Sequence, residues 1–211
     1  MVTMDDSFEP VGSMPMVGGD LSLDFVNTGS GREEGPFRER LATYEDIVVW
    51  GERSGAIDGA TAERLVSEAA ERPGEASRVL ERGRELREAI YGLFTATGGG
   101  IEVAQGDLDV LNRELVRASE QRVVAASGGT LAWRWTADSP LDRVLAVVAA
   151  AAADLATGAA VERVKECGGT NCNWLFRDTS RNRSRRWCDM RDCGNRAKAR
   201  RYYARHRHED G

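Results

Sequence analysis

The residues best suited to do chemistry are four cysteines near the end of the chain. They are Cys167, Cys172, Cys188 and Cys193, and they form two C-x4-C pairs with fifteen residues between the pairs. Structural zinc sites are tetrahedral and commonly take their four ligands as two pairs from separate chain segments. We therefore predict that these thiols hold a structural Zn2+ ion. Four protein ligands leave no open coordination position, so we expect the metal to stabilise the fold and not to catalyse a reaction.

Three other roles for these cysteines stay open at this point: two disulfides, buried structural thiols, or ligands of an iron–sulfur cluster. The N-terminal segment has acidic residues where a signal peptide needs a basic flank, and no apolar run reaches the roughly 20 residues of a membrane span. We expect a cytoplasmic protein. A reducing cytoplasm disfavours disulfides, and the polar neighbours of these cysteines disfavour buried thiols.

A dense set of arginines surrounds the second cysteine pair. Residues 162–211 carry a net charge of +7, whereas residues 1–161 carry −12. Guanidinium groups match phosphate oxygens in a bidentate manner, and some can reach guanine edges in a major groove. The alternative is a solvated basic face that serves solubility only. We predict a nucleic-acid-binding surface made of Arg181, Arg183, Arg185, Arg186, Arg196, Lys198, Arg200, Arg201 and Arg205.

The chain that positions these residues divides into two parts. Residues 1–160, which we call the body, show helical periodicity over 43–55, 60–71, 75–97, 108–119 and 141–156. Thr43 and Asp46 approximate a capping box, and Ser139 and Pro140 suit the start of the last of these helices. Two alternating runs on either side of Gly128-Gly129 predict a β-hairpin. The fold class we expect is mainly α with a small β-hairpin.

Residues 161–211, which we call the finger, are expected to form a treble-clef-like zinc finger. Short strands are expected at 161–166 and 174–177, and a helix from Gly194 to about 206. Gly168 and Gly169 supply backbone freedom for a tight turn between the first two cysteines, and Gly194 does the same at the start of the helix. A module of this size cannot build enough core alone, so metal binding would supply much of its folding free energy.

The finger closely resembles the CGNR zinc finger, through "CNWLFRD", "SRNRSRRWC" and "CGNRAKARR". The body, with "LSLDFVNT", "ELREAIYGLF" and the "LAWRW" hairpin, resembles the ABATE domain, described as a "putative stress-induced transcription regulator". The resemblance covers nearly the whole chain. It implies zinc at the four cysteines, DNA binding by the finger and a role in the stress response.

From these observations we predict a transcriptional regulator that binds DNA through an Arg-rich helix, with the acidic body as sensor or interaction module. Such a protein would associate with the nucleoid when it binds DNA. We expect no enzymatic activity, because the chain has no evident nucleophile–base pair and both histidines lie in the terminal run His206-Arg207-His208. Binding of RNA or of an acidic protein partner is the alternative. RNA could stack on Trp187, Tyr202 and Tyr203, although packing of these rings under the finger helix is the interpretation we favour.

The body has several further candidate roles. It could bind a small-molecule effector, form a homodimer, or dock the basic finger in an inactive state through its net negative charge. Asp24, Asn27, Trp133 and Trp135 are candidates for an effector pocket, with core and capping roles as the alternative for each.

Overall fold

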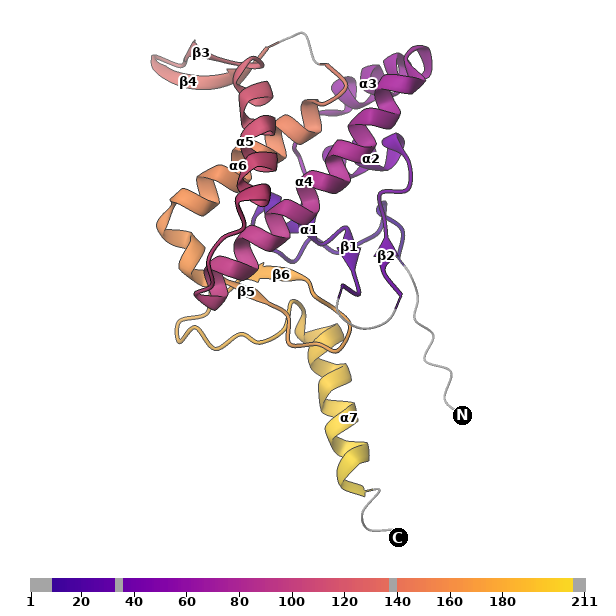
Figure 1. Ribbon diagram of the computed structural model, residues 1–211, viewed down its shortest axis with the longest axis vertical. Coiled ribbons are helices and arrows are strands. Elements are labelled where there is room, and N and C mark those ends of the chain that lie inside the picture. The colour runs from indigo at the N-terminus through magenta and orange to yellow at the C-terminus, as the bar shows by residue number, and fades with distance from the viewer. Residues whose placement is uncertain (1–8, 33–35, 137–139, 207–211) are drawn as a thin grey trace.

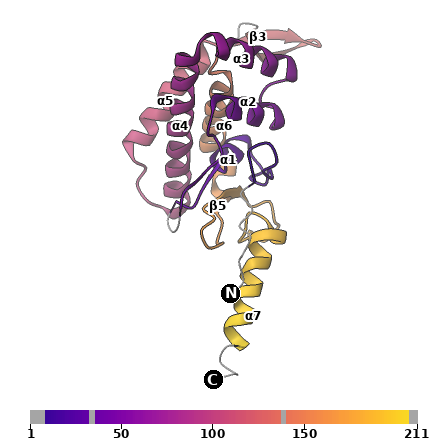
Figure 2. The ribbon, with the colours of Figure 1, turned by 90° about the vertical axis from the view of Figure 1, so that its right-hand side faces the viewer.

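The computed structural model describes residues 9–32, 36–136 and 140–206, with the side chains of residues 205 and 206 outside the described part. Helices dominate, and the three sheets have two strands each, so the expected fold class is confirmed. Figure 1 shows the body helices gathered in the upper part of the molecule, the hairpin at its top and the finger below. Figure 2 shows the last helix extending away from the body. Within the described residues, no helix combines the length and the apolarity needed to cross a bilayer.

Six helices and two small sheets build the body, and most of them were expected from the sequence. The helices are α1 (Leu21–Val26), α2 (Tyr44–Arg53), α3 (Gly59–Glu71), α4 (Pro73–Gly99), α5 (Gln105–Ser119) and α6 (Arg143–Thr157). The antiparallel pairs are β1 (Gly29–Ser30) with β2 (Arg38–Glu39), and β3 (Arg122–Ser127) with β4 (Thr130–Trp135). The β3–β4 hairpin was expected, whereas the β1–β2 pair was not, because two-residue strands leave no alternating pattern to read.

The helix boundaries follow local chemistry. The capping box at the start of α2 is confirmed, since Thr43 and Asp46 exchange side-chain to backbone hydrogen bonds. Gly100 ends α4 in the left-handed conformation at φ 65°, which glycine adopts without strain. The start of α6 was misplaced: Asp142 is its N-cap and Pro140 precedes the helix, while Ser139 lies outside the described residues. Leu141 and Asp142 form a turn before the helix. The apolar periodicity that was used to place the helix therefore begins two residues too early.

The finger contains one strand pair and one helix. A 3-10 turn, η1 (Ala159–Arg163), leads into β5 (Val164–Glu166), which pairs antiparallel with β6 (Leu175–Arg177). The strand expected over 161–166 is therefore half as long, since its first residues form the 3-10 turn. A π-type turn, η2 (Met190–Gly194), then leads into α7 (Asn195–His206).

One hydrophobic core runs through both parts of the chain. Trp174, Leu175 and Phe176 of the finger and the four cysteines belong to the same buried cluster as Phe25, Trp50 and Leu86 of the body. Strand β6 packs on α1, and β5 packs on α4. The finger thus uses the apolar surface of the body to bury its strands, which agrees with the small core available to its 51 residues.

Asn27 joins α1 to the finger through a two-way hydrogen bond. Its side chain donates from Nδ2 to the carbonyl of Leu175 at 2.9 Å and accepts at Oδ1 from the Leu175 amide at 2.8 Å. The side chain is fully buried, so it serves the outer edge of β6 as a neighbouring strand would. Asn27 of the "LSLDFVNT" motif therefore has a core role.

Asp24 holds the segment that lies next to β6. Its carboxylate accepts from the Gly18 amide at 2.8 Å, and the Gly18 carbonyl accepts from the Arg177 amide at 2.7 Å. Burial raises the pKa of Asp24 to about 6, against the opposing effect of the hydrogen bond from Gly18. Asp24 and Asn27 thus act at the seam, our name for the contact between body and finger.

We expect Asn27→Ala to lower the free energy of unfolding by about 2–4 kcal/mol, because it leaves the buried amide and carbonyl of Leu175 without partners. Urea unfolding followed by circular dichroism measures the loss. Asn112→Ala, on the exposed side of α5, is the matched control and should change stability little. An equal effect of the two substitutions would contradict the role of Asn27.

Asp24→Asn should stabilise the protein increasingly as pH rises. Because the folded-state pKa lies above the model value of 3.8, the carboxyl favours folding when protonated and loses that contribution as pH rises through about 6. The stability of the variant relative to wild type should therefore grow by about 1–2 kcal/mol between pH 5 and 8.

Asp58→Asn is the opposite-sign control for Asp24. The side-chain and backbone hydrogen bonds of Thr61 lower the pKa of Asp58, so the contribution of that carboxylate is lost as pH falls. That loss begins only below the ordinary value of 3.8, so Asp58→Asn should run parallel to wild type from pH 5 to 8, while the stability of Asp24→Asn relative to wild type rises. A flat difference for Asp24→Asn over this range would show that burial does not raise the pKa of Asp24.

Candidate metal centre and basic surface

The four cysteines meet in one buried cluster. Their Sγ atoms all lie within 4.8 Å of one another, and the Cys172–Cys188 and Cys188–Cys193 pairs are each 3.7 Å apart. Four thiolates at about 2.3 Å from a tetrahedral ion are roughly 3.8 Å apart, so the spacing fits such an ion. The separations are too long for disulfide bonds, and all four cysteines are free. The structure thus forms a potential metal-binding site from the residues expected.

Two donors outside the sulfur cluster stabilise negative charge on it. The Cys188 amide donates to Cys167 Sγ at 3.2 Å, and Arg196 Nη2 donates to Cys193 Sγ at 3.2 Å. Hydrogen bonds from Cys172, Cys188 and Cys193 hold the pKa of the Cys167 thiol well below its usual range. The hydrogen bonds with Cys167 raise the pKa of Cys172 and Cys188, so these two thiols must lose a proton when a metal binds, since metals bind the thiolate form.

Gly169 of the metal loops is required for space, whereas the close contact at Gly194 is with the flexible Met190 side chain. A Cβ on Gly169 would lie 2.9 Å from Cys193 Sγ, and a Cβ on Gly194 would lie 2.5 Å from the sulfur of Met190. Neither glycine has a positive φ, so steric room and not unusual backbone conformation explains Gly169. The left-handed positions of this loop are Asn171 and Asn173, at φ 57° and 54°, residues that tolerate that region.

The arginines divide into two groups, and the division could not be seen in the sequence. Arg185 points inward: it donates to the carbonyls of Trp187, Cys188 and Val17, and its guanidinium lies 4.4 Å from the centroid of the Phe176 ring. Arg196 is half-buried against Cys193 and Asp192. These two guanidinium groups hold the finger together, and the structure does not place them with the exposed cations.

Six of the remaining cations in the expected surface are exposed. Three lie on the loop before the third cysteine and three on α7: Arg181, Arg183, Arg186, Lys198, Arg200 and Arg201. Arg205 is in the last turn of α7, and its side chain lies outside the described part of the chain. The exposed loop and the exposed helix both belong to the finger, and α7 extends from the molecule away from the body (Figures 1 and 2).

Asp178 shapes the loop that carries the exposed arginines. This fully buried carboxylate accepts from Lys165 Nζ at 2.7 Å, from the Ser180 amide at 2.9 Å and from the Arg185 amide at 3.0 Å. The bond from Lys165 and those from Ser180 lower the pKa of Asp178. Sequence reasoning missed this residue. The D-x-S pattern of Asp178 and Ser180 was a usable signal, since an aspartate often accepts from the residue two positions later.

The aromatic residues of the finger are only partly packed. Trp187 is half-buried and packs against the shared core, whereas packing under the finger helix was expected. Tyr202 and Tyr203 are 57% and 68% exposed, and their rings meet edge to face at 5.7 Å. The expectation that the tyrosines pack under the finger helix is therefore wrong, because both rings are exposed on a helix that extends away from the other described elements (Figure 2).

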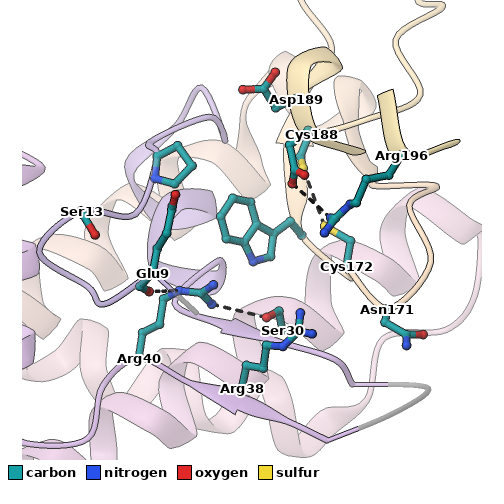
Figure 3. Close-up of a pocket in the computed structure, with 13 residues that line it drawn as sticks. Glu9, Ser13, Ser30, Arg38, Arg40, Asn171, Cys172, Cys188, Asp189 and Arg196 are labelled. Atoms are coloured by element: carbon teal, nitrogen blue, oxygen red, sulfur yellow. Dashed lines mark hydrogen bonds and ion pairs between the residues drawn. The ribbon is translucent and has the colours of Figure 1, made fainter. Parts of the chain in front are cut away.

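A polar cleft of about 450 Å3 lies on the seam beside the cysteine cluster. Figure 3 shows Glu9, Ser30 and Arg40 of the body on one side and Cys172, Cys188 and Arg196 of the finger on the other. Arg40 donates to the Glu9 carbonyl at 3.0 Å and to Ser30 Oγ at 3.3 Å, and its guanidinium lies 5.4 Å from the Trp174 ring centroid. The pocket candidates from the sequence are not part of it: Asp24 and Asn27 are buried at the seam, and Trp133 and Trp135 belong to the hairpin.

The described finger residues make no ion pair with an acidic residue of the body. Lys165 pairs with Asp178, Arg183 with Glu162 and Arg196 with Asp192, all within the finger. Among the described residues, the basic finger is therefore not docked on acidic groups of the body. Body and finger meet instead through apolar packing and hydrogen bonds, several of which come from side chains such as those of Asn27 and Arg185.

Comparisons with known proteins agree with the two-part organisation. The family model ABATE, described as "Putative stress-induced transcription regulator", matches residues 19–159, and the CGNR zinc finger model matches residues 163–206. No curated protein matches the chain. The first model alone spans well over half of the sequence, and the second spans the cysteine cluster together with α7. The chain therefore belongs to the ABATE family and ends in a CGNR zinc finger.

Proposed function

We propose that this protein is a transcriptional regulator that binds DNA through its zinc finger. The observation that carries the proposal is the position of α7, which is anchored at the cysteine cluster and extends into solvent with Lys198, Arg200 and Arg201 exposed. A projecting helix has the dimensions to enter a major groove, and exposed lysine and arginine side chains neutralise phosphates. The arginine loop beside it supplies further phosphate contacts through Arg181, Arg183 and Arg186.

The ion in the cluster is zinc in this proposal, and its role is structural. Cys167, Cys172, Cys188 and Cys193 would fill a tetrahedral shell, so the site supplies folding free energy and no Lewis-acid chemistry. The sequence of α7 is polar on all sides, and such a helix has little stability of its own. Cys193 lies in η2, two residues before α7 begins, so a metal held there fixes where the helix starts and points. The protein has no catalytic activity in this proposal.

The body would act as support and sensor. It holds the finger strands through Asn27 and the shared core, so a change at the seam alters the position of α7. The seam cleft is the place where a small molecule would contact both parts at once, because its walls come from β1, β2, the cysteine loops and Arg196. Body and finger sites would then be coupled through the same contacts.

Binding of single-stranded nucleic acid is the second candidate, favoured by the exposed Tyr202 and Tyr203. Aromatic rings beside basic groups provide stacking platforms for unpaired bases. Duplex binding would depend on the cations and little on the tyrosines. The two candidates are therefore distinguished by comparing tyrosine and arginine variants on single- and double-stranded substrates.

Arg196→Gln should weaken metal binding by roughly 10–100-fold, the usual cost of losing a group that supports a metal ligand. The expected baseline is one zinc per chain, measured by elemental analysis, with affinity from competition against a chelator. Arg200→Gln, one helical turn further along α7 and exposed, is the matched control. A zinc content near zero in the wild type would overturn the metal site itself.

The double variant Lys198→Ala/Arg201→Ala should bind duplex DNA more weakly and with less salt dependence. Each lost phosphate contact lowers the slope of log affinity against log salt by about 1, so we expect a decrease of about 2. Fluorescence anisotropy across a salt series measures it, and zinc content shows whether the finger is intact.

Arg78→Ala is the control for DNA binding, because Arg78 is an exposed arginine on the body helix α4. Its slope should equal that of wild type. Tyr203→Ala should leave duplex affinity nearly unchanged. The second candidate would be favoured if Tyr203→Ala lost more affinity for single-stranded nucleic acid than the double variant loses for duplex DNA.

A further inference from the structure

The β3–β4 hairpin carries the most conspicuous apolar surface of the described residues. Val123, Val124, Leu131 and Trp133 are 47%, 55%, 76% and 62% exposed. The register pairs Val124 with Trp133 and Ala126 with Leu131, and alternate pairs of an antiparallel ladder share a face. Val124, Ala126, Leu131 and Trp133 therefore lie together on one face, which we call the hairpin patch. Clusters of large exposed apolar side chains usually mark an interaction surface.

The hairpin is fixed at its base and uncovered beyond it. At the base, Arg143 of α6 donates to Gln121 Oε1 and to the Thr136 carbonyl, both at 2.9 Å, and lies 5.2 Å from the Trp135 ring centroid. Past this point β3 and β4 pair only with each other within the described chain. Figure 1 shows them projecting from the top of the molecule. A two-stranded sheet with a bare apolar face is marginally stable in water, so a partner that covers the patch would stabilise it.

The charges of the hairpin favour an identical partner over a charged one. Residues 121–136 contain two arginines and no acidic residue. Arg122 lies at the base with its guanidinium 4.8 Å from the Trp133 ring centroid, and Arg134, on the opposite face, donates to Ser127 Oγ at 3.0 Å. The outer part of the patch is uncharged. Two copies that meet in antiparallel orientation place their Arg122 side chains at opposite ends, so no like charges face each other.

We propose that the hairpin patch binds a second copy of this chain, with the two patches packed face to face about a two-fold axis. Leu131 and Trp133 of each copy would then cover the corresponding residues of the other, as a self-complementary interface requires. The exposed parts of the three large side chains amount to roughly 300 Å2 per copy, well below the ~800 Å2 per partner of a standard interface. The dimer is therefore weak and reversible.

This geometry has a consequence that rests on the proposed DNA binding. The hairpin and α7 lie at opposite ends of the molecule (Figure 1), so a dimer formed at the hairpins carries its fingers at its two far ends. Such a dimer joins two separate DNA segments and does not read two adjacent half-sites on one duplex.

Sedimentation of the full-length, zinc-loaded protein without DNA tests the interface independently of DNA binding. From about 1 to about 200 µM, the wild type should change from monomer to dimer, with a dissociation constant in the micromolar range. Leu131→Ser and Trp133→Ser should each raise that constant at least tenfold. Val123→Ser removes an exposed apolar side chain from the opposite face of the same hairpin and should leave the constant unchanged.

Leu131→Ser should not disturb folding, because Leu131 lies near the hairpin tip, away from the contacts with α6. A wild type that stays monomeric throughout the range would overturn the proposal, as would equal effects of Val123→Ser and Leu131→Ser. The affinity of the monomeric Leu131→Ser protein for duplex DNA is measured separately. If this variant loses the dimer but keeps its DNA affinity, the result supports the hairpin interface. If no variant binds DNA, the proposed function of the finger fails and the hairpin interface is unaffected.

Discussion

The structure depends on bringing four sulfur atoms from two chain segments to within 4.8 Å of one another. Thiolates at that separation repel each other unless a cation lies among them, and hydrogen bonds from neighbouring donors offset only part of that repulsion. The Cys188 amide and the Arg196 guanidinium supply such bonds here. Once the cluster is closed, the loop after Cys172, the π-type turn and the first residue of α7 have their positions set, and the direction of the last helix follows.

The metal cluster alone does not position the finger on the body. That placement comes from β6, whose outer edge is bonded by the Asn27 side chain and by the Gly18 carbonyl, and whose apolar face enters the core of the body. Body and finger are therefore separate in the sequence, but their side chains pack into one core. Folding of the finger strands and folding of the body should be cooperative, because neither can lose the shared core without exposing the other.

The sequence predicted the cysteine cluster because metal ligands can be recognised by residue type and spacing, which do not depend on the rest of the fold. It predicted the body helices because their apolar periodicity is long and regular, and it predicted the hairpin because glycines separate two alternating runs. It could not sort the arginines, since Arg185 and Arg186 are neighbours of the same type. Only the positions of Phe176 and of the Trp187 and Cys188 carbonyls show that Arg185 turns inward. The seam was equally hidden, because the bond between Asn27 and Leu175 joins residues 148 positions apart.

The sorting of the arginines changes how the charge of the finger should be understood. A net +7 over residues 162–211 suggests a uniformly basic module, yet Arg185 and Arg196 are occupied by carbonyls, a carboxylate and a sulfur of the finger itself. Both would be poor phosphate ligands, because binding a phosphate would cost them those contacts. The cations that remain exposed lie on two elements held by buried groups, the loop by Asp178 and the helix by Cys193. Their spacing is therefore set by buried groups. A basic surface with rigid spacing can contact the regularly spaced phosphates of a duplex in a fixed register, whereas a flexible one only attracts them.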